Sequence, residues 1–266
     1  EAAGHRVRRI RADGVLETVA GTGVPGMGGD TGLGKDAKLN GPRGIAFGPD
    51  GSLYIADSLN RRVRRVAPDG RITTIAGDGR NLYQGDGAQA ALASFEQPTD
   101  VAIAPDGSIV IGDVDTDVIR RVAPDGIITT IAGKTNETCG PTAVCGDNGP
   151  ATQAIFQFET RAGISFGDGG MYVADEFHQR VRFVDSTGLI RTVVGSGNGC
   201  NTLGIECGDD GPARAANLAR PVAMASHPDG SLYVCDHLNY RVRKVAATLP
   251  GLSVLDVVIP SPDGSA

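Results

Sequence analysis

Short segments in which hydrophobic and polar residues alternate recur along this chain, and tight-turn signals separate them. Residues 43–77 read RGIAFG, a Pro-Asp-Gly turn, SLYIAD, a four-residue loop, RVRRVA, a second Pro-Asp-Gly turn and RITTIAG. Alternation over about five residues rich in Val, Ile, Thr and Tyr is typical of half-buried β-strands. Pro presets φ in the turn, Asp bonds the nearby backbone and Gly takes positive φ. The segment therefore predicts four short antiparallel strands joined by tight turns.

The same pattern occurs four times, which indicates an internal structural repeat. Two series of aspartates, one after the second strand of each unit and one in the linkers, keep step at intervals of 56 to 62 residues. The members are Asp57, Asp113, Asp175 and Asp236 in the first series, and Asp30, Asp86, Asp147 and Asp209 in the second. Four-stranded antiparallel units at such a period are typical of β-propeller blades. We therefore predict an all-β propeller domain over residues 1–258.

Four nearly complete blades and one partial blade are expected, followed by an exit segment at 259–266. The blades are placed at about 42–77, 97–133, 160–195 and 220–258, and the partial blade at 5–20. The tail LSVLDVVIPSPDGSA has two interpretations, as a fourth strand of the last blade or as the start of a further repeat at its PDGS. In the linker GDNGPATQAIFQF, Asp147 or Asn148 is expected to cap a short helical turn near Pro150.

Charge and hydropathy argue against nucleic acid as the partner and against a membrane-spanning helix. The 266 residues carry a formal net charge of −6 at pH 7. Nucleic-acid binding needs a basic surface, so the acidic balance argues against that class. No apolar run approaches the roughly 20 residues of a membrane-spanning helix. Because the chain opens inside a repeat and without Met, we expect it to be a piece of a longer polypeptide.

Four of the five cysteines form close pairs in equivalent linkers of two successive repeats, Cys139 with Cys145 and Cys200 with Cys207. Flexible loops of this length can bring two sulfurs into bonding distance. We expect two local disulfides and hence an oxidising compartment. The alternative is a single four-cysteine zinc site, although the two-residue spacing typical of such sites is absent. The fifth, Cys235, is expected to be a small buried residue.

The segments GDNGPATQAIF, GIAFGPDGSLYIADSLNRRVRRVAPDGRITTIAG and DHLNYRVRKV resemble those of NHL-repeat propellers over essentially the whole chain. Linkers ending in CGDNGPA and CGDDGPA, with the exit LPGLSVLDVVIPSPDGSA, resemble a narrower group, the teneurin-like YD-repeat proteins that include Rhs-type polymorphic toxins. The resemblance implies a six-bladed ring that precedes a shell of YD repeats in a secreted or cell-surface protein. No YD repeat is itself present in the sequence.

Aspartate–arginine pairs flank the loop between the second and third strands. Facing each other across a hairpin, Asp57 and Arg62 are expected to form an ion pair that closes the blade corner. The same interpretation applies to two further pairs, Asp175 with Arg180 and Asp236 with Arg241. An active-site role is the alternative, but a feature repeated in three blades is better explained as scaffold.

The second complete blade departs from this pattern, because Val118 stands in place of the arginine. Asp113, Asp115 and Asp117 alternate in its loop, and carboxylates are the ligands that Ca²⁺ prefers. The Gly and bidentate Glu that continue a typical calcium loop do not follow. We therefore expect solvated turn acids and no cofactor, with a calcium site as the alternative.

Histidines offer a second chemical interpretation. His5, His178 and His237 occupy equivalent loops on one expected face, whereas His227 lies towards the opposite face. Lyases built on NHL-like propellers, such as the peptide-amidating lyases, use a histidine-bound metal, so this resemblance implies a metal-dependent lyase as the alternative function. Histidines without a ligand are the simpler interpretation.

Paired basic residues raise the possibility of RNA binding, which some NHL propellers perform. Strand alternation sends the two members of each pair to opposite sides of the sheet, and aromatic residues for base stacking are lacking. The pairs are Arg64/Arg65, Arg120/Arg121 and Arg243/Lys244. No nucleic-acid partner is therefore expected.

The loops between second and third strands differ in every blade, reading SLNR, VDTD, EFHQ and HLNY. Variable loops with apolar and aromatic side chains on a regular scaffold are typical of protein recognition. We therefore expect a non-catalytic module whose partner is a neighbouring YD-repeat shell or a cell-surface protein. The expected contact residues are Leu59, Asn60, Phe177, His178, Leu238 and Tyr240.

Overall fold

The computed structural model describes residues 1–140, 143, 145–200 and 207–246, and the backbone of 253–257. The expected exit segment at 259–266 lies outside these residues. The chain divides into two compact units, Glu1–Ile131 and Ala132–Ala266. All described helices are three-residue 3₁₀ turns, and none is long and apolar enough to cross a membrane.

The first unit contains a two-stranded hairpin and two four-stranded antiparallel sheets. The hairpin consists of β1 (Val7–Ile10) and β2 (Leu16–Ala20). The first sheet consists of β3 (Pro42–Phe47), β4 (Leu53–Asp57), β5 (Arg62–Val66) and β6 (Ile72–Ala76). The second consists of β7 (Pro98–Ile103), β8 (Ile109–Asp113), β9 (Val118–Val122) and β10 (Ile128–Ala132). The 3₁₀ turns are η1 (Gly34–Asp36), η2 (Ser58–Asn60) and η3 (Ala90–Leu92).

The second unit contains two further four-stranded antiparallel sheets. One consists of β11 (Ile164–Gly167), β12 (Gly170–Asp175), β13 (Arg180–Val184) and β14 (Ile190–Val194). The other consists of β15 (Pro221–Ser226), β16 (Leu232–Asp236), β17 (Arg241–Ala246) and β18 (Ser253–Val257). The 3₁₀ turns are η4 (Ala151–Gln153), η5 (Ala213–Ala215) and η6 (His237–Asn239).

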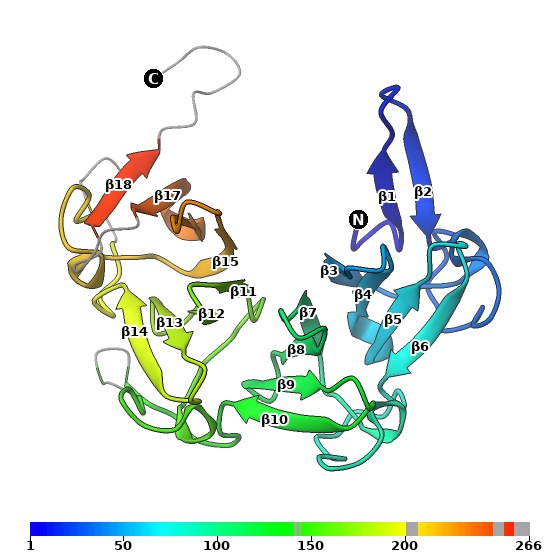
Figure 1. Ribbon diagram of the computed structural model, residues 1–266, viewed down its shortest axis with the longest axis horizontal. Coiled ribbons are helices and arrows are strands. Elements are labelled where there is room, and N and C mark those ends of the chain that lie inside the picture. The colour runs from blue at the N-terminus through cyan, green and yellow to red at the C-terminus, as the bar shows by residue number, and fades with distance from the viewer. Residues whose placement is uncertain (141–142, 144, 201–206, 247–252, 258–266) are drawn as a thin grey trace. The chain divides into compact units, whose positions relative to one another are not determined.

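Each four-stranded sheet is a simple meander of the kind found in propeller blades (Figure 1). The predicted all-β architecture of four-stranded antiparallel blades is confirmed. β18 pairs antiparallel with β17, so the tail supplies the fourth strand of the last blade. In the turn after β3, the carboxylate of Asp50 accepts the backbone N–H of Ser52, which is the local bond that the Pro-Asp-Gly signal predicts.

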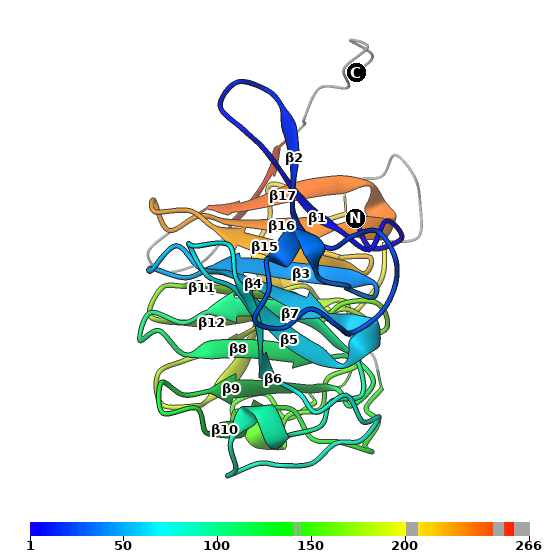
Figure 2. The same ribbon diagram turned by 90° about the vertical axis from the view of Figure 1, so that its right-hand side faces the viewer.

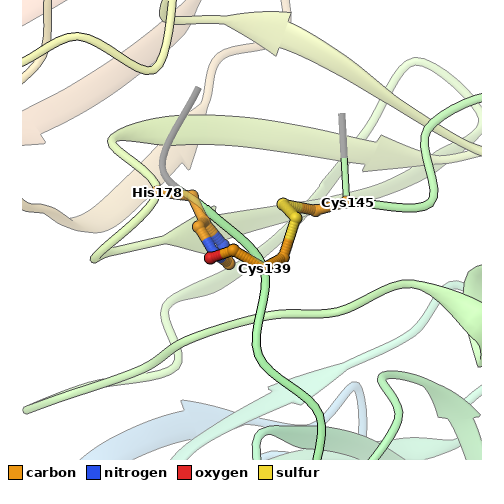
Figure 3. A group of neighbouring side chains, drawn as sticks. All are labelled: Cys139, Cys145 and His178. Carbon is orange, nitrogen blue, oxygen red and sulfur yellow. A yellow bond between two sulfur atoms is a disulfide. The ribbon is translucent and has the colours of Figure 1, made fainter. Parts of the chain in front are cut away.

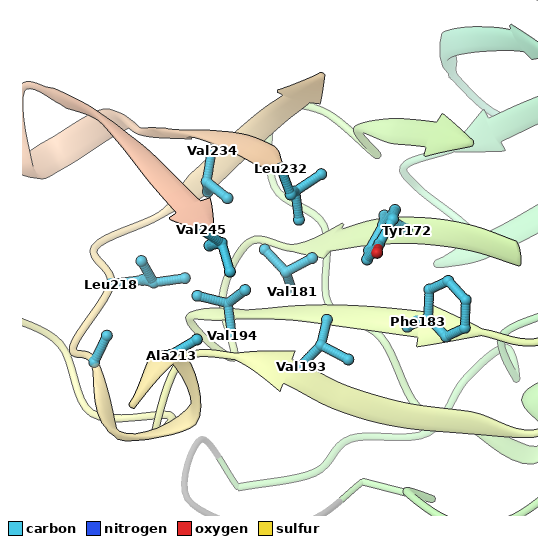
Figure 4. Packing of buried hydrophobic residues seen from close by; sticks show 11 residues of the cluster. Tyr172, Val181, Phe183, Val193, Val194, Ala213, Leu218, Leu232, Val234 and Val245 are labelled. Carbon is cyan, nitrogen blue, oxygen red and sulfur yellow. The ribbon is translucent and has the colours of Figure 1, made fainter. Parts of the chain in front are cut away.

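Apolar side chains fill the space between successive blades of a unit. In the first unit, β3 and β7 lie against each other, as Figure 2 shows. Val63, Phe95 and Ile111 are among the residues of the hydrophobic cluster that joins the two blades. In the second unit, Val181 and Val194 meet Val234 and other side chains of the next blade (Figure 4). The linker turn η5 closes one end of this cluster through Ala213. Linkers are therefore part of the core as well as connections.

Candidate functional site

One arginine in the middle of the third strand of every four-stranded blade is buried, with at most 1% of the residue exposed. These residues are Arg64, Arg120, Arg182 and Arg243. Because a buried guanidinium is costly unless it is paired and hydrogen-bonded, each of them requires carboxylates or carbonyls around it.

Arg64 on β5 meets two carboxylates from different segments. Its Nη1 lies 3.2 Å from Oδ2 of Asp57 at the end of β4, and its Nη2 lies 2.7 Å from Oδ1 of Asp30 in the preceding linker. The Lys38 carbonyl accepts a further bond from Nη1 at 3.4 Å. We call this arrangement of buried arginine, strand-end aspartate and linker aspartate the arginine clamp. It ties the second strand, the third strand and the linker of one repeat together.

Both blades of the second unit repeat the arginine clamp. Arg182 on β13 lies 3.1 Å from Asp175 and 2.6 Å from Asp147, measured between nitrogen and carboxylate oxygen. Arg243 on β17 lies 3.4 Å from Asp236 and also pairs with Asp209. Each arginine additionally donates to a cysteine carbonyl of its linker, that of Cys145 or of Cys207.

The β7–β10 blade keeps the arginine but changes its partners. Arg120 bonds Asp86 at 2.6 Å and two linker carbonyls, and its guanidinium lies over the Phe95 ring at 5.0 Å. Asp113 instead accepts the backbone N–H groups of Glu96 and Gln97. Burial raises the pKa of Asp113 to about 6, and these two bonds only partly oppose that rise. This blade thus encloses an acid that is half protonated near pH 6.

The predicted corner ion pairs need a correction, because the strand-end aspartates pair with a different arginine. Asp57 and Arg62 are directly opposite in the β4–β5 register, yet the guanidinium of Arg62 donates to the Asp78 carbonyl. Asp57 pairs with Arg64, two residues further along on the same face of the strand. The deeper position excludes water, and this favours the pairing of the two charges there.

The same correction applies in the second unit. Arg180 donates to the carbonyls of Ala143 and Ser196, while Asp175 pairs with Arg182. Arg241 pairs with Asp209, while Asp236 pairs with Arg243. The linker aspartates therefore bind arginines. Asp147 accepts hydrogen bonds from Arg182 and from the Thr192 N–H. The prediction that Asp147 or Asn148 caps this turn is wrong, because η4 has no side-chain cap.

The calcium alternative receives no geometric support in the described part of the chain. Asp113 turns inward, whereas Asp115 is exposed and Asp117 lies in a left-handed conformation at φ 56°. Their carboxylates do not form a group with ligand atoms within 4.8 Å of one another. Alternation brings side chains together along a strand, but only Asp113 belongs to β8, and Asp115 and Asp117 lie in the loop that follows it.

The expected contact residues separate into two classes. Leu59, Leu238 and Tyr240 are exposed, at 49%, 46% and 79%. Phe177 is half-buried. Asn60 and His178 are buried, because they turn back onto the strand-end aspartates Asp57 and Asp175, and so they are not available to a partner.

Both predicted disulfides are formed, Cys139–Cys145 and Cys200–Cys207, with Cα–Cα distances of 5.7 and 5.8 Å. Cys235 is half-buried between Ala223 and Val242 on the neighbouring strands, and burial raises the pKa of its thiol. The Cys139 and Cys145 sulfurs lie beside the ring of His178 (Figure 3).

Three of the four histidines have side-chain partners within their own units, and the fourth, His237, is exposed. Both ring nitrogens of His178 are bonded, Nδ1 to Asp175 at 2.8 Å and Nε2 to the Cys139 carbonyl at 3.2 Å. Nδ1 of His5 accepts the Gly41 N–H, and His227 pairs with Asp229. Across the described residues, no group of three histidines offers ligand atoms within 4.8 Å of one another.

The arginine clamp was not predicted, although the sequence carries a signal for it. The buried arginine follows its linker aspartate by 34 or 35 residues in all four repeats. The exposed member of each basic pair follows directly, and the burial of Arg64 beside the half-exposed Arg65 confirms that the two face opposite sides. The nearly constant spacing between linker aspartate and arginine would have been enough to predict that the second aspartate series pairs with these arginines.

Comparisons with known proteins give relatives but no family model, since no protein-family model matches the chain. The chain is 33% identical to Teneurin-m of Drosophila melanogaster over 258 residues, 89% of this chain. It is 30% identical to human Teneurin-4 over 261 residues, again 89% of this chain. The chain spans 9% of the length of each of these curated relatives.

Solved structures with the same fold include enzymes. A streptogramin B lyase matches with a TM-score of 0.56 and 13% identity, over 97% of this chain and 63% of that chain. A gluconolactonase from Xanthomonas campestris matches with a TM-score of 0.58 and 15% identity, over 97% of this chain and 70% of that chain. At these identities the likeness shows the fold alone. In sequence, the chain is similar to one short segment of the teneurins along most of its own length.

Proposed function

We propose that this chain is a non-catalytic NHL-type propeller module that recognises protein, within a larger secreted or cell-surface protein of the teneurin-like or Rhs-type YD-repeat group. The similarity to teneurins and the two disulfides support a cell-surface setting. The module would be part of a six-bladed ring, and its partner would be the adjoining YD-repeat shell or a cell-surface protein.

The observation that carries this proposal is the contrast at the blade corners between buried, paired charges and exposed apolar or aromatic side chains. In three of the four blades the strand-end aspartate at the corner is engaged in an arginine clamp. The exposed residues of η6 and the residue after it are His237, Leu238 and Tyr240, and the last two offer an apolar and an aromatic side chain. Aromatic anchors on a rigid corner are the groups that dominate protein–protein affinity. We call Leu238 and Tyr240 the η6 corner.

Tyr240 is held outward by its backbone. It takes the left-handed conformation at φ 54° and caps η6, with its N–H bonded to the His237 carbonyl. A side chain presented by a fixed backbone loses little conformational entropy on binding. Leu59 of η2 has the equivalent place in the first unit, and this makes it the second site where we propose contact.

The test is site-specific photo-crosslinking in the parent protein. A photoreactive residue at position 240 is expected to link to a defined protein segment, and one at Pro228 is expected not to. Pro228 is exposed in the turn at the other end of β16 and serves as the matched control. Linkage to YD repeats of the same chain would identify the shell as partner, and linkage to another protein would identify a receptor. Equal, weak linkage at both positions would contradict the proposal.

The affinity of an identified complex gives a second measurement. Replacing Leu238 and Tyr240 together by Ser is expected to weaken binding by about tenfold or more, as for interface anchors. The melting temperature should be unchanged, because both side chains are exposed.

A metal-dependent lyase is the alternative function that the sequence raises. It requires histidines with a free nitrogen, but both nitrogens of His178 are bonded. Measurement of bound transition metal in the purified protein tests it, and stoichiometric metal lost on replacing His5, His178 and His237 together would favour the lyase over the recognition module.

A further inference from the structure

The two disulfides occupy equivalent linkers of successive blades but have different neighbours. In both, the second cysteine is buried at 4% exposure and its carbonyl accepts from the clamp arginine of the following blade. Beside Cys139–Cys145 stands His178, three residues after the strand-end aspartate. The equivalent position in the next blade is Asn239, whose amide donates to Asp236. The chain thus contains two equivalent disulfide linkers, and only the first is followed by a blade with an ionisable side chain at this position.

The surroundings of His178 favour a positively charged ring. Nδ1 faces the Asp175 carboxylate and Nε2 faces the Cys139 carbonyl, and both partners only accept hydrogen bonds. Both nitrogens must therefore carry a proton for both bonds to form. Burial and the nearby Arg182 act to lower the pKa of His178, but the hydrogen bond and charge of Asp175 outweigh them and raise it.

The two cysteines are unequally exposed. Cys139 is half-buried and Cys145 is buried, and a sulfur of each lies within 4.8 Å of a ring nitrogen of His178. A thiolate arriving from solvent meets Cys139 Sγ first, so Cys145 Sγ is the leaving group. Exchange is faster when the leaving thiolate is stabilised by a nearby positive charge or proton donor.

We propose that Cys139–Cys145 is a thiol–disulfide exchange site for small thiol reductants, in which His178 positions and protonates the leaving sulfur. The attacking thiolate forms a bond to Cys139 Sγ, the Cys139–Cys145 bond breaks, and its electron pair passes to Cys145 Sγ. Cys145 Sγ then takes a proton from His178 as one of the two ring N–H groups leaves its present acceptor, Asp175 or the Cys139 carbonyl. The second thiolate of a dithiol then attacks the mixed disulfide and releases Cys139. The reductant leaves as a disulfide, having supplied two electrons. Cys200–Cys207, whose blade has Asn239 at the position equivalent to His178, is the structural counterpart without this assistance.

Opening this bond would also affect the packing of its linker. The Cys139 carbonyl is bonded to His178 and the Cys145 carbonyl to Arg182. These two bonds join the linker to the β11–β14 blade, so exchange at the sulfurs acts on the point where linker, loop and arginine clamp meet. Exchange at Cys139–Cys145 therefore has a structural readout within its own repeat.

The test is the reduction of both disulfides in the same folded chain by dithiothreitol, followed by alkylation and peptide mass spectrometry. Both disulfides meet the same thiolate concentration, so the ratio of their rate constants is internally normalised. In the wild type at pH 6, Cys139–Cys145 is expected to be reduced about tenfold faster, as a charge-stabilised leaving group predicts. The ratio should fall as the pH is raised and His178 loses its proton. A ratio near one, or one that does not change with pH, overturns the proposal.

Two exchanged variants complete the test. His178→Asn copies the sister blade and should bring the ratio close to one, while Asn239→His should accelerate reduction of Cys200–Cys207. An unchanged ratio in His178→Asn contradicts the proposal. If that variant loosens the fold, reduction of Cys200–Cys207 will accelerate as well, and the wild-type pH profile then decides the question.

Discussion

Arg64 carries a full positive charge into a position that water does not reach, and the two carboxylates around it are what make this tolerable. A buried ion pair adds little net stability, but removal of one partner leaves an uncompensated charge. The strand-end Asp57 is as deeply buried as Arg64, and burial raises its pKa. At the residue scale, the arginine clamp is therefore most sensitive to the loss of one member.

Neighbouring arginines provide the matched comparison. Arg64→Met is expected to lower the free energy of unfolding by about 3–5 kcal/mol, because Asp57 stays buried without its partner. Arg65→Met should cost at most about 1 kcal/mol, since Arg65 pairs with Asp50 at the half-exposed surface. Urea denaturation of both variants measures the difference. Equal losses would mean that Arg64 acts only through its aliphatic stem.

Asp113 is expected to make stability depend on pH. Burial raises its pKa from the ordinary 3.8 to about 6, so between these values the folded state binds more protons than the unfolded state. The contribution of Asp113 to stability therefore falls as the pH rises from about 4 through about 6, and it levels off near pH 7.

Urea denaturation at pH 4.5 and pH 7 of the wild type and Asp113→Asn measures this contribution. The asparagine keeps one acceptor and does not titrate, so the variant should gain on the wild type by about 2 kcal/mol as the pH rises from 4.5 to 7. An identical gap at both pH values would show that Asp113 is ionised throughout.

The site residues illustrate what the sequence can and cannot predict. The disulfides follow from spacing, because a short loop leaves few other partners for two cysteines. The pairing of Asp57 with Arg64 rather than Arg62 depends on which guanidinium lies deeper, and a strand pattern does not reveal depth. The burial of His178 depends likewise on its turning towards Asp175.

At the scale of elements, the hairpins follow from alternation and turn chemistry, and the blade ends follow from glycine. Gly77 after β6 has φ +94°, and a Cβ there would collide with the Arg61 carbonyl oxygen and lie 3.0 Å from the Arg62 Cα. Gly195 after β14 stands in the same relation to Gln179 and Arg180. The fourth strand thus approaches the start of the third closely enough to exclude any side chain at this point.

A pair of glycines separates this steric effect from the cost of the left-handed backbone. Gly107 has φ +82° and open space around its missing Cβ, so Gly107→Ala should cost about 1 kcal/mol from conformation alone. Gly77→Ala should cost about 3 kcal/mol or more, because backbone must also move. Thermal unfolding of both variants distinguishes them, and similar melting temperatures would show that the corner yields easily.

At the scale of the whole molecule, the repeat was the most predictable feature, because two aspartate series in step leave one register for the blades. The sequence did not predict whether a linker aspartate pairs with the blade before it or the blade after it. Strand patterns indicate which strands are neighbours, but not which distant charged residues form ion pairs. The contacts answer this within each unit. Asp86, between β6 and β7, bonds Arg120 of the blade that follows, and Asp147 bonds Arg182 in the same sense.

This direction of pairing has a consequence for how such chains gain and lose blades. The smallest segment that carries all its buried charges together is a linker followed by its blade, such as 78–132, and not a blade followed by a linker. Recombination at the ends of β6, β10 or β14 transfers each buried arginine with the carboxylates that pair with it. A junction placed just before the first strand would separate Arg120 from Asp86. In this kind of protein, gene duplication is therefore expected to copy units that begin with a linker and end with the fourth strand of the following blade. The ion pairs set these boundaries, which lie one linker before the boundaries that the sheets alone suggest.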